Sequence, residues 1–302
     1  MPAIICGSLA YDSIAVFGGK FSDHILADRI HSINVSFFVP QMRREHGGCA
    51  ANIAYAYKLL GGTPIVVGAV GEDGADYLER LRKLGISTDH ISTVLGTLTA
   101  QAYIMTDEAN NQITSFHPGA MSHAHDVAVP DKTARIAILA PDGKEATLTH
   151  ARQCKAHNID IIFDPGQGLP MFSGDELKPL VDDAAYVVVN DYEAGMVSEK
   201  LGKTEREWCI GKKGVIVTRG EHGCEVFDGN AWHSLAGVKA KAVVDPTGCG
   251  DAFRGSLLWA LENNRSWVDA ARIGNVVGAI KVAHQGGQNY TMTAQEVLAG
   301  LL

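Results

Sequence analysis

The chain has 302 residues, of which 46% are hydrophobic, and its formal net charge at pH 7 is −8. A chain of this length can bury a large core in one α/β domain with a small appendage. The acidic balance, together with the lack of any basic run, argues against a nucleic-acid partner, and no apolar run is long enough to span a membrane. We expect a cytoplasmic protein, because the six cysteines follow no disulfide spacing and the first residues lack the features of a signal peptide.

In chain order, the first segments alternate between patterns typical of a main α/β fold and patterns typical of short strands outside it. A buried-strand pattern over 3–6 is followed by Asp12, and residues 14–44 then mix phenylalanines with glycines, polar residues and an alternating stretch at 33–36. That mixture is typical of short strands outside a main fold. The pair Gly47-Gly48 opens the first predicted helix, which ends at a second glycine pair. A strand over 65–70 and a helix over 75–84 come next.

Residues 98–116 again show the pattern that is typical of short strands. Two β-patterned runs, 101–106 and 113–116, flank a polar turn, which predicts a hairpin with a longer loop. With the earlier excursion, this hairpin predicts a small sheet built from about 12–45 and 97–118, which closes as a lid over a single domain spanning 1–302. The alternative is that both segments are surface loops.

The second half alternates strands and helices regularly, the pattern of a doubly wound, mostly parallel sheet with helices on both faces. Ligands of such sheets bind beyond the carboxyl ends of the strands, so the polar residues near those ends are expected at one edge. The strands are predicted at 136–140, 159–163, 186–189 and 215–218, and the polar residues are Asp12, Asp164, Asn190, Glu193, Thr218, Asp245 and Asp251. This gathering of oxygen groups indicates a phosphate and Mg²⁺ site.

The stretch Asp245-Pro-Thr-Gly-Cys-Gly-Asp-Ala-Phe-Arg-Gly255 is the most informative in the chain. It follows the strand-like pair Val243-Val244 and leads into a helical pattern. Residues 248–251 then form the first turn of that helix, where unpaired N–H groups and the positive dipole end favour an anion. Asp251 in the same turn could take a proton from a hydroxyl. The alternative is that Asp251 caps the helix and the glycines only punctuate a turn.

The complete stretch resembles the D-x-x-G-A-G-D signature of the ribokinase (PfkB) superfamily, with Cys249 where that family usually has alanine. The resemblance implies an anion hole at Gly248, Cys249 and Gly250, with Asp251 as the catalytic base. The backbone role leaves the Cys249 side chain unimportant; the alternative is that the helix N-terminus lowers its pKa. Further motifs match the family in order along nearly the whole chain, so chance is a poor explanation.

On the substrate side, Gly47-Gly48 with Asn52 resembles the family's first signature, which contacts substrate hydroxyls, and Asp12 matches its diol-binding acid. On the nucleotide side, the resemblance implies Mg²⁺ and phosphate handling, ATP contacts and a monovalent-cation region open to K⁺. Asn190 and Glu193 are implied for Mg²⁺ and phosphate handling, and Asp245 for the cation region. The implied ATP contacts are Asn190, Thr218, Arg219, Gly220, Gly223 and Asn275. Pro246, where many relatives have threonine, leaves the geometry of that cation region open.

Within the superfamily, the sequence is most similar to those of prokaryotic nucleoside kinases related to adenosine kinase. The matching stretches are 6–12, 42–49, 111–120 and 163–170. This resemblance implies transfer of the ATP γ-phosphoryl group to the 5′-hydroxyl of a nucleoside. Gln112, Phe116 and Gln167 are candidates for base contacts by placement, although packing within the small sheet is the alternative for Phe116.

Two other functions stay open: a sugar or sugar-phosphate kinase of the same fold, and a catalytically silent nucleotide-binding regulator. The resemblance further implies that the exposed face of the small sheet pairs with a second subunit, a monomer being the alternative. The histidines 117, 123 and 125 are expected to be ordinary loop residues.

Overall fold

The computed structural model describes residues 2–25, 34–109 and 111–301. Its main sheet has nine strands in the order β13-β12-β11-β10-β9-β8-β1-β4-β5, and only the β11–β12 and β12–β13 pairings are antiparallel. The strands are β1 (Ala3–Cys6), β4 (Pro64–Gly71), β5 (Ile91–Val94), β8 (Ile136–Leu139), β9 (Asp160–Phe163), β10 (Tyr186–Asn190), β11 (Gly214–Thr218), β12 (Cys224–Phe227) and β13 (Trp232–Leu235). The mostly parallel sheet is confirmed.

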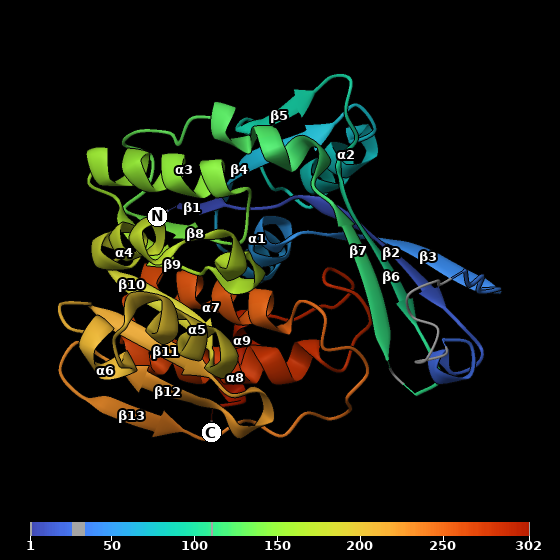
Figure 1. Cartoon of the computed structure of the whole chain (residues 1–302). Coiled ribbons are helices and arrows are strands. Elements are labelled where there is room, and N and C mark those ends of the chain that lie inside the picture. The colour runs from blue at the N-terminus through green and yellow to red at the C-terminus, as the bar shows by residue number, and fades with distance from the viewer. Residues whose placement is uncertain (1, 26–33, 110, 302) are drawn as a thin grey trace.

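Helices cover both faces of this sheet (Figure 1). One face carries α1 (Cys49–Leu59), α2 (Ala75–Lys83), α7 (Cys249–Glu262), α8 (Trp267–Lys281) and α9 (Ala294–Ala299). The other carries α3 (Lys144–Ala156), α4 (Gly174–Asp183), α5 (Asp191–Leu201) and α6 (Glu205–Trp208). Short 3₁₀ turns lie at η1 (Phe21–Asp23), η3 (Gly119–Asp126), η4 (Gly166–Met171) and η5 (Gly220–His222).

The core follows from the two-residue period of the strands. Ile138 and Ile216 pack with the α1/α7/α8 layer, whereas their strand neighbours Ala137 and Val217 pack with the α3/α4/α5 layer. Because both faces of each central strand are buried, the strands read in the sequence as continuous apolar runs rather than alternating ones. The carboxyl ends of these strands are therefore the part of the sheet left free for polar chemistry.

Among the described residues, the small sheet contains four strands in the order β3-β2-β6-β7, namely β2 (Ala10–Val16), β3 (Gln41–Gly47), β6 (Ala100–Thr106) and β7 (Gln112–His117). It projects from one side of the main body (Figure 1). The prediction of a sheet built from two excursions is confirmed, and the surface-loop alternative is wrong. Ile33, in the predicted alternating stretch, lies outside the described residues, and residues 34–40 form no regular element.

Two local expectations differ from the structure. Val243 and Val244 form no strand; they are 81% and 56% exposed, and the N–H of Val244 bonds to the carbonyl of Val282. Two β-branched residues without a buried face do not make a strand, whatever their local preference. β12 and β13 were also not predicted, because their short runs gain their strand pairing only from β11 and from each other. Within the described residues, no helix combines the length and apolarity needed to cross a membrane.

Candidate active site

The N-terminus of α7 lies at the carboxyl edge of the main sheet. Gly248 precedes the helix with φ of +76°, and a Cβ there would sit 3.0 Å from the Cα of Gly287, so glycine suits both the turn and the close approach. First-turn N–H groups have no partner within a helix, and the dipole adds positive potential. The N–H of Cys249 donates to the carbonyl of Pro246 at 3.1 Å. This turn is suited to an anion, which would compete with Pro246 for the Cys249 N–H.

Asp251 lies in the same turn and accepts a hydrogen bond from Asn52 Nδ2 at 2.8 Å. Burial raises the pKa of Asp251 to about 6, although the Asn52 hydrogen bond and the charge of Arg254 oppose that rise. A carboxyl group with this pKa is ionised at neutral pH and is a stronger base than an exposed aspartate. Asp251 can therefore accept a proton from a hydroxyl placed beside the anion site.

A second carboxylate, Asp12, faces this region from β2 of the small sheet. Burial raises the pKa of Asp12 to about 6, and the negative charges of Asp251 and Glu45 add to the rise. A Cβ on Gly47 would lie 2.2 Å from Asp12 Oδ2, and one on Gly48 would lie 2.5 Å from the carbonyl oxygen of Ser8. The glycine pair thus leaves room for Asp12 where β3 turns into α1.

Asn52 is held in place by a polar network that the sequence analysis missed. Gln288 Nε2 donates to Asn52 Oδ1 at 3.0 Å and lies 3.4 Å from the Tyr77 hydroxyl, which donates to the carbonyl of Gly47. This arrangement assigns the Asn52 amide so that its nitrogen faces Asp251. The sequence offered little signal for Gln288, which is one of two glutamines that flank a glycine pair in the C-terminal tail and belongs to no recognised motif.

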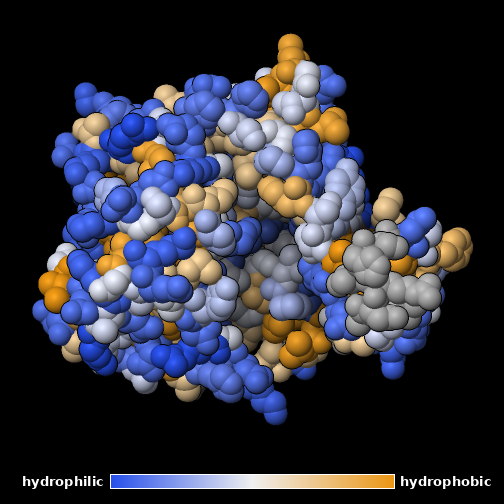
Figure 2. All heavy atoms as spheres, viewed as in Figure 1, coloured by the Kyte–Doolittle hydropathy of each residue, from blue (hydrophilic) through white to orange (hydrophobic). Residues whose placement is uncertain are grey.

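Two adjoining cavities open at the same sheet edge, of about 440 and 720 Å³. The smaller includes Asp251, Asp164 and Glu193, and the larger includes Phe253, Asn275 and Val282. Thr218, Gly220, Gly250 and Arg254 line both cavities. The space-filling view shows a recess between the main body and the small sheet (Figure 2). The anion-favouring turn therefore lies where two binding spaces meet.

Asp164 differs from its expected place in a metal site. Both of its carboxylate oxygens accept from Arg254, from Nε and Nη2, at 2.8 Å each, and both side chains are buried. Burial raises the pKa of Asp164, and the positive charge of Arg254 opposes this. Because a bidentate pair uses both oxygens, Asp164 fixes Arg254 rather than a metal. Arg254, which the sequence analysis also missed, brings its charge to both cavities.

Asn190 and Glu193 form a reciprocal cap at the start of α5. Glu193 Oε2 and Oε1 accept from the backbone N–H and Nδ2 of Asn190, at 2.8 and 2.9 Å, and Asn190 Oδ1 accepts from the Glu193 N–H. Burial raises the pKa of Glu193. Both residues line the smaller cavity. Their free lone pairs suit water-mediated contact with a metal, and no cluster of three or more His, Cys, Asp or Glu ligands occurs among the described residues.

Of the six predicted ATP residues, Thr218, Gly220, Gly223 and Asn275 line the larger cavity, whereas Asn190 lines only the smaller one. Gly223 has φ of +92°. Asn275 Nδ2 donates to the carbonyl of Ala236 at 3.1 Å. Arg219 lines neither cavity, and its N–H bonds to the carbonyl of Gly223. Arg219 thus closes the tight turn between β11 and β12.

The three residues predicted to contact a base do not gather in one place. Gln112 is exposed on β7 and donates to Thr114 Oγ1 at 2.7 Å. Phe116 on the same strand is 51% exposed, so its surroundings cover it only in part. Gln167 lines the smaller cavity and donates to the thiol of Cys49 at 3.7 Å. Gln167 therefore lies with the phosphate-side residues, apart from the other two.

Cys249 and Asp245 flank the anion-favouring turn. Burial raises the thiol pKa of Cys249 to about 11, and the charge of Lys281 only partly opposes it, so the alternative of a lowered pKa is wrong. Asp245 Oδ2 accepts from the N–H of Gly286 at 2.8 Å, and Oδ1 accepts from that of Thr247 at 2.9 Å. Burial alone would raise the pKa of Asp245, but these two hydrogen bonds bring it below its usual value.

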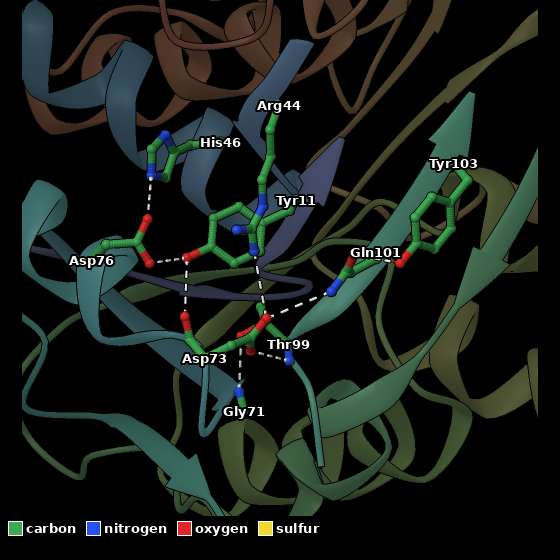
Figure 3. Close-up of polar contacts among 9 residues, drawn as sticks. All are labelled: Tyr11, Arg44, His46, Gly71, Asp73, Asp76, Thr99, Gln101 and Tyr103. Carbon is green, nitrogen blue, oxygen red and sulfur yellow. Dashed lines mark hydrogen bonds and ion pairs between the residues drawn. The ribbon is translucent and has the colours of Figure 1, made fainter. Parts of the chain in front are cut away.

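The junction between the two sheets is held by acidic residues near the start of α2 (Figure 3). The Tyr11 hydroxyl donates to Asp76, and the guanidinium of Arg44 stacks 3.5 Å from the centre of the Tyr11 ring. Asp73 Oδ1 accepts from both the N–H and the hydroxyl of Thr99 at 2.7 Å. These contacts tie β2, β3 and β6 of the small sheet to the main body at their base.

Comparison with known proteins agrees with this geometry. Residues 12–294 match the pfkB family of carbohydrate kinases. The structure of a Burkholderia thailandensis nucleoside kinase in complex with inosine is 45% identical, covers 99% of this chain and 96% of that chain, and superposes with a TM-score of 0.90. The same enzyme in complex with ADP-inosine is 46% identical, covers 99% and 94% of the two chains, and has a TM-score of 0.88.

A curated relative, the nucleoside kinase of Methanocaldococcus jannaschii, is 28% identical over 96% of this chain and 97% of its own length. The chain belongs to the pfkB family of carbohydrate kinases, enzymes that transfer a phosphoryl group to a hydroxyl.

Proposed function

We propose that this protein is an ATP-dependent nucleoside kinase, similar to adenosine kinases, that phosphorylates the 5′-hydroxyl of a ribonucleoside. The observation that carries the proposal is Asp251, which lies in an anion-favouring helix turn and is oriented by Asn52. The inosine complexes of the Burkholderia enzyme support a nucleoside as the acceptor.

In this proposal the nucleoside lies between the small sheet and α7. Asp12 accepts hydrogen bonds from the ribose 2′- and 3′-hydroxyls, and Gly47, Gly48 and Asn52 complete that site. At pH 7 a carboxyl group with a pKa of about 6 is mostly ionised, so Asp12 is a strong acceptor for a diol. We expect Phe116 and Gln112 to contact the base when the small sheet closes toward α7.

The chemical step depends on positioning and on charge. Asp251 accepts the proton of the 5′-hydroxyl while the oxygen of that hydroxyl attacks the γ-phosphorus in line, and ADP leaves. The N–H groups of Gly248, Cys249 and Gly250 stabilise the charge on the transferring group. Arg254 contributes positive charge from the shared wall of the two cavities.

The adenine nucleotide occupies the larger cavity in this proposal, lined by Gly223 and Asn275, with its phosphates directed toward Gly250. Kinases of this family use a divalent metal with the nucleotide. Asn190 and Glu193 would hold Mg²⁺ through water, and the ion would neutralise charge on the phosphates.

We further propose that the chain is one catalytic unit in which the small sheet is a lid. Closure would exclude water, so that ATP is not hydrolysed in place of nucleoside phosphorylation. Tyr103, Ile113 and Phe116 are each more than 40% exposed, at 49, 42 and 51%. The same apolar side chains could instead pair two copies of the chain, which light scattering with and without nucleoside would distinguish.

A coupled assay of ADP release tests the proposed function. ATP with Mg²⁺ is offered with adenosine, inosine, guanosine, cytidine, ribose, fructose or fructose 6-phosphate. Turnover of nucleosides with ribose inert is expected, because the base contributes to recognition. Turnover of sugars alone would agree with the chemistry of the family but contradict the proposal that the acceptor is a nucleoside. Binding of ATP with no turnover of any acceptor would favour a silent regulator.

A further inference from the structure

Lys281, the last residue of α8, is fully buried and forms an unusual set of contacts. Its Nζ donates to the backbone carbonyl of Asp245 at 2.7 Å and to that of His284 at 3.1 Å. In the described part of the chain, no carboxylate lies within ion-pair distance of this ammonium. Buried lysines usually have such a partner. Lys281 is instead held by carbonyl dipoles, as monovalent cations often are in proteins.

The two carbonyls belong to segments that flank the anion-favouring turn. The N–H groups of Val244 and Asp245 donate to the carbonyl of Val282, at 2.8 and 3.1 Å, and Gly286 donates to the Asp245 carboxylate. Residues 245–248 lead directly into α7, and Gly248 lies against Gly287. The ammonium therefore fastens together the two loops that determine where the Gly248–Gly250 N–H groups lie.

A monovalent ion does not fit at the Asp245 carbonyl of this chain. The oxygen already accepts from Lys281 Nζ, and an added K⁺ would lie beside a like charge in a buried place. The K⁺ expectation placed in the Asp245 region thus disagrees with the side chains that are present there.

We propose that the Lys281 ammonium is a built-in cation that takes the place of a bound monovalent ion, so that phosphoryl transfer by this protein does not need K⁺. Lys281 is a positioning residue: it acts through the Asp245 and His284 carbonyls on the turn that binds the transferring phosphoryl group. This inference depends on the proposed kinase function for its effect on catalysis, and its structural part stands separately.

The test compares the wild type with Lys281→Ala, which leaves space for an ion, and Lys281→Met, which fills that space without charge. Lys212→Ala is the matched control, because Lys212 is also buried and donates to a backbone carbonyl, that of Asp182, away from the cavities. Nucleoside turnover is measured in tetramethylammonium buffer and then with added K⁺ or NH₄⁺.

We expect wild-type kcat to change less than about twofold with K⁺, since its cation is already present. Lys281→Ala should lose about 100-fold in kcat with a smaller change in KM, and K⁺ or NH₄⁺ should restore about tenfold. Lys281→Met should lose kcat without rescue, and Lys212→Ala should show no response to either ion. Wild-type kcat that rises tenfold or more with K⁺ would overturn the proposal, and this holds even if the variants do not fold.

Thermal unfolding gives a readout that does not need turnover. K⁺ should raise the unfolding midpoint of Lys281→Ala but not that of the wild type or Lys212→Ala, because an ion that binds only the folded state stabilises it. A folded Lys281→Ala whose midpoint and kcat both ignore K⁺ contradicts the inference. If the midpoint responds while no acceptor is phosphorylated by the wild type, the built-in cation stands and the kinase proposal fails.

Discussion

The start of α7 and the small sheet face each other across the proposed site, and the chain supports them very differently. Asp251 is held by Asn52, Arg254 is locked by Asp164, and the neighbouring loops are tied by Lys281, all through largely buried contacts. In the small sheet, every residue of β7 is exposed, and the sheet projects from one side of the main body (Figure 1). Groups that perform chemistry gain from rigid support, whereas a cover over a ligand must be able to move.

The largest expected effect comes from removing the base on the rigid side. Asp251→Asn keeps a hydrogen-bond acceptor for Asn52 but can no longer take the hydroxyl proton, so kcat should fall by about 10³-fold or more. ATP and nucleoside should still bind, which calorimetry can measure. Asp175→Asn is the control, an exposed acid in the first turn of α4. Turnover that survives in Asp251→Asn would show that another group is the base.

The ion pair beneath the anion-favouring turn should dominate stability. Arg254→Met leaves the Asp164 carboxylate buried and unpaired, which should lower the free energy of unfolding by about 3–5 kcal/mol. The double variant Arg254→Met/Asp164→Leu should regain most of that loss in chemical denaturation. Its KM for ATP should still be raised, since the positive charge at the cavities is gone.

The exposed pair of Arg272 and Asp269 provides the control for that experiment. Arg272→Met should change stability by less than about 1 kcal/mol, because water screens exposed ion pairs. Equal losses from Arg254→Met and Arg272→Met would contradict the contrast between the two regions.

Asp12 lies on the small sheet, the proposed lid, and faces the start of α7, so its replacement should affect binding more than chemistry. Asp12→Asn should raise the nucleoside KM by about 100-fold and leave the KM for ATP nearly unchanged. In the wild type, kcat/KM for the nucleoside should fall as the pH drops through about 6, where Asp12 and Asp251 become protonated and neutral. A flat profile between about pH 5 and 7, roughly one pH unit on either side of that pKa, would mean that neither carboxylate must be ionised.

The smallest effect is expected at the junction of the two sheets. Asp73→Ala removes the acceptor for Thr99 and Arg44, so the small sheet should become looser and the nucleoside KM should rise by about tenfold. Hydrogen exchange of β6 and β7 should quicken, while that of α7 stays the same. Glu79→Ala, on the exposed face of α2, should change neither quantity.

Much of the fold could be predicted because local sequence patterns indicate most of its strands and helices. The apolar runs of β8 to β11 and the glycines before α1 and α7 determine their elements through burial and backbone freedom alone. Predictions were wrong where a pattern was short. Val243 and Val244 look like a strand in sequence, and only the tertiary structure shows that no neighbouring strand pairs with them.

The candidate site divides in the same way. The sequence alone indicated the candidates for the chemistry, because Asp251, the glycines around it and Asp12 stand at positions that match the motifs of one family. Only the tertiary structure decided what supports them. Asn52 and Asp251 lie 199 residues apart, Gln288 and Asn52 lie 236 apart, and Arg254 and Asp164 lie 90 apart. Contacts over such separations depend on how helices pack on the sheet, and no local spacing in the chain encodes them.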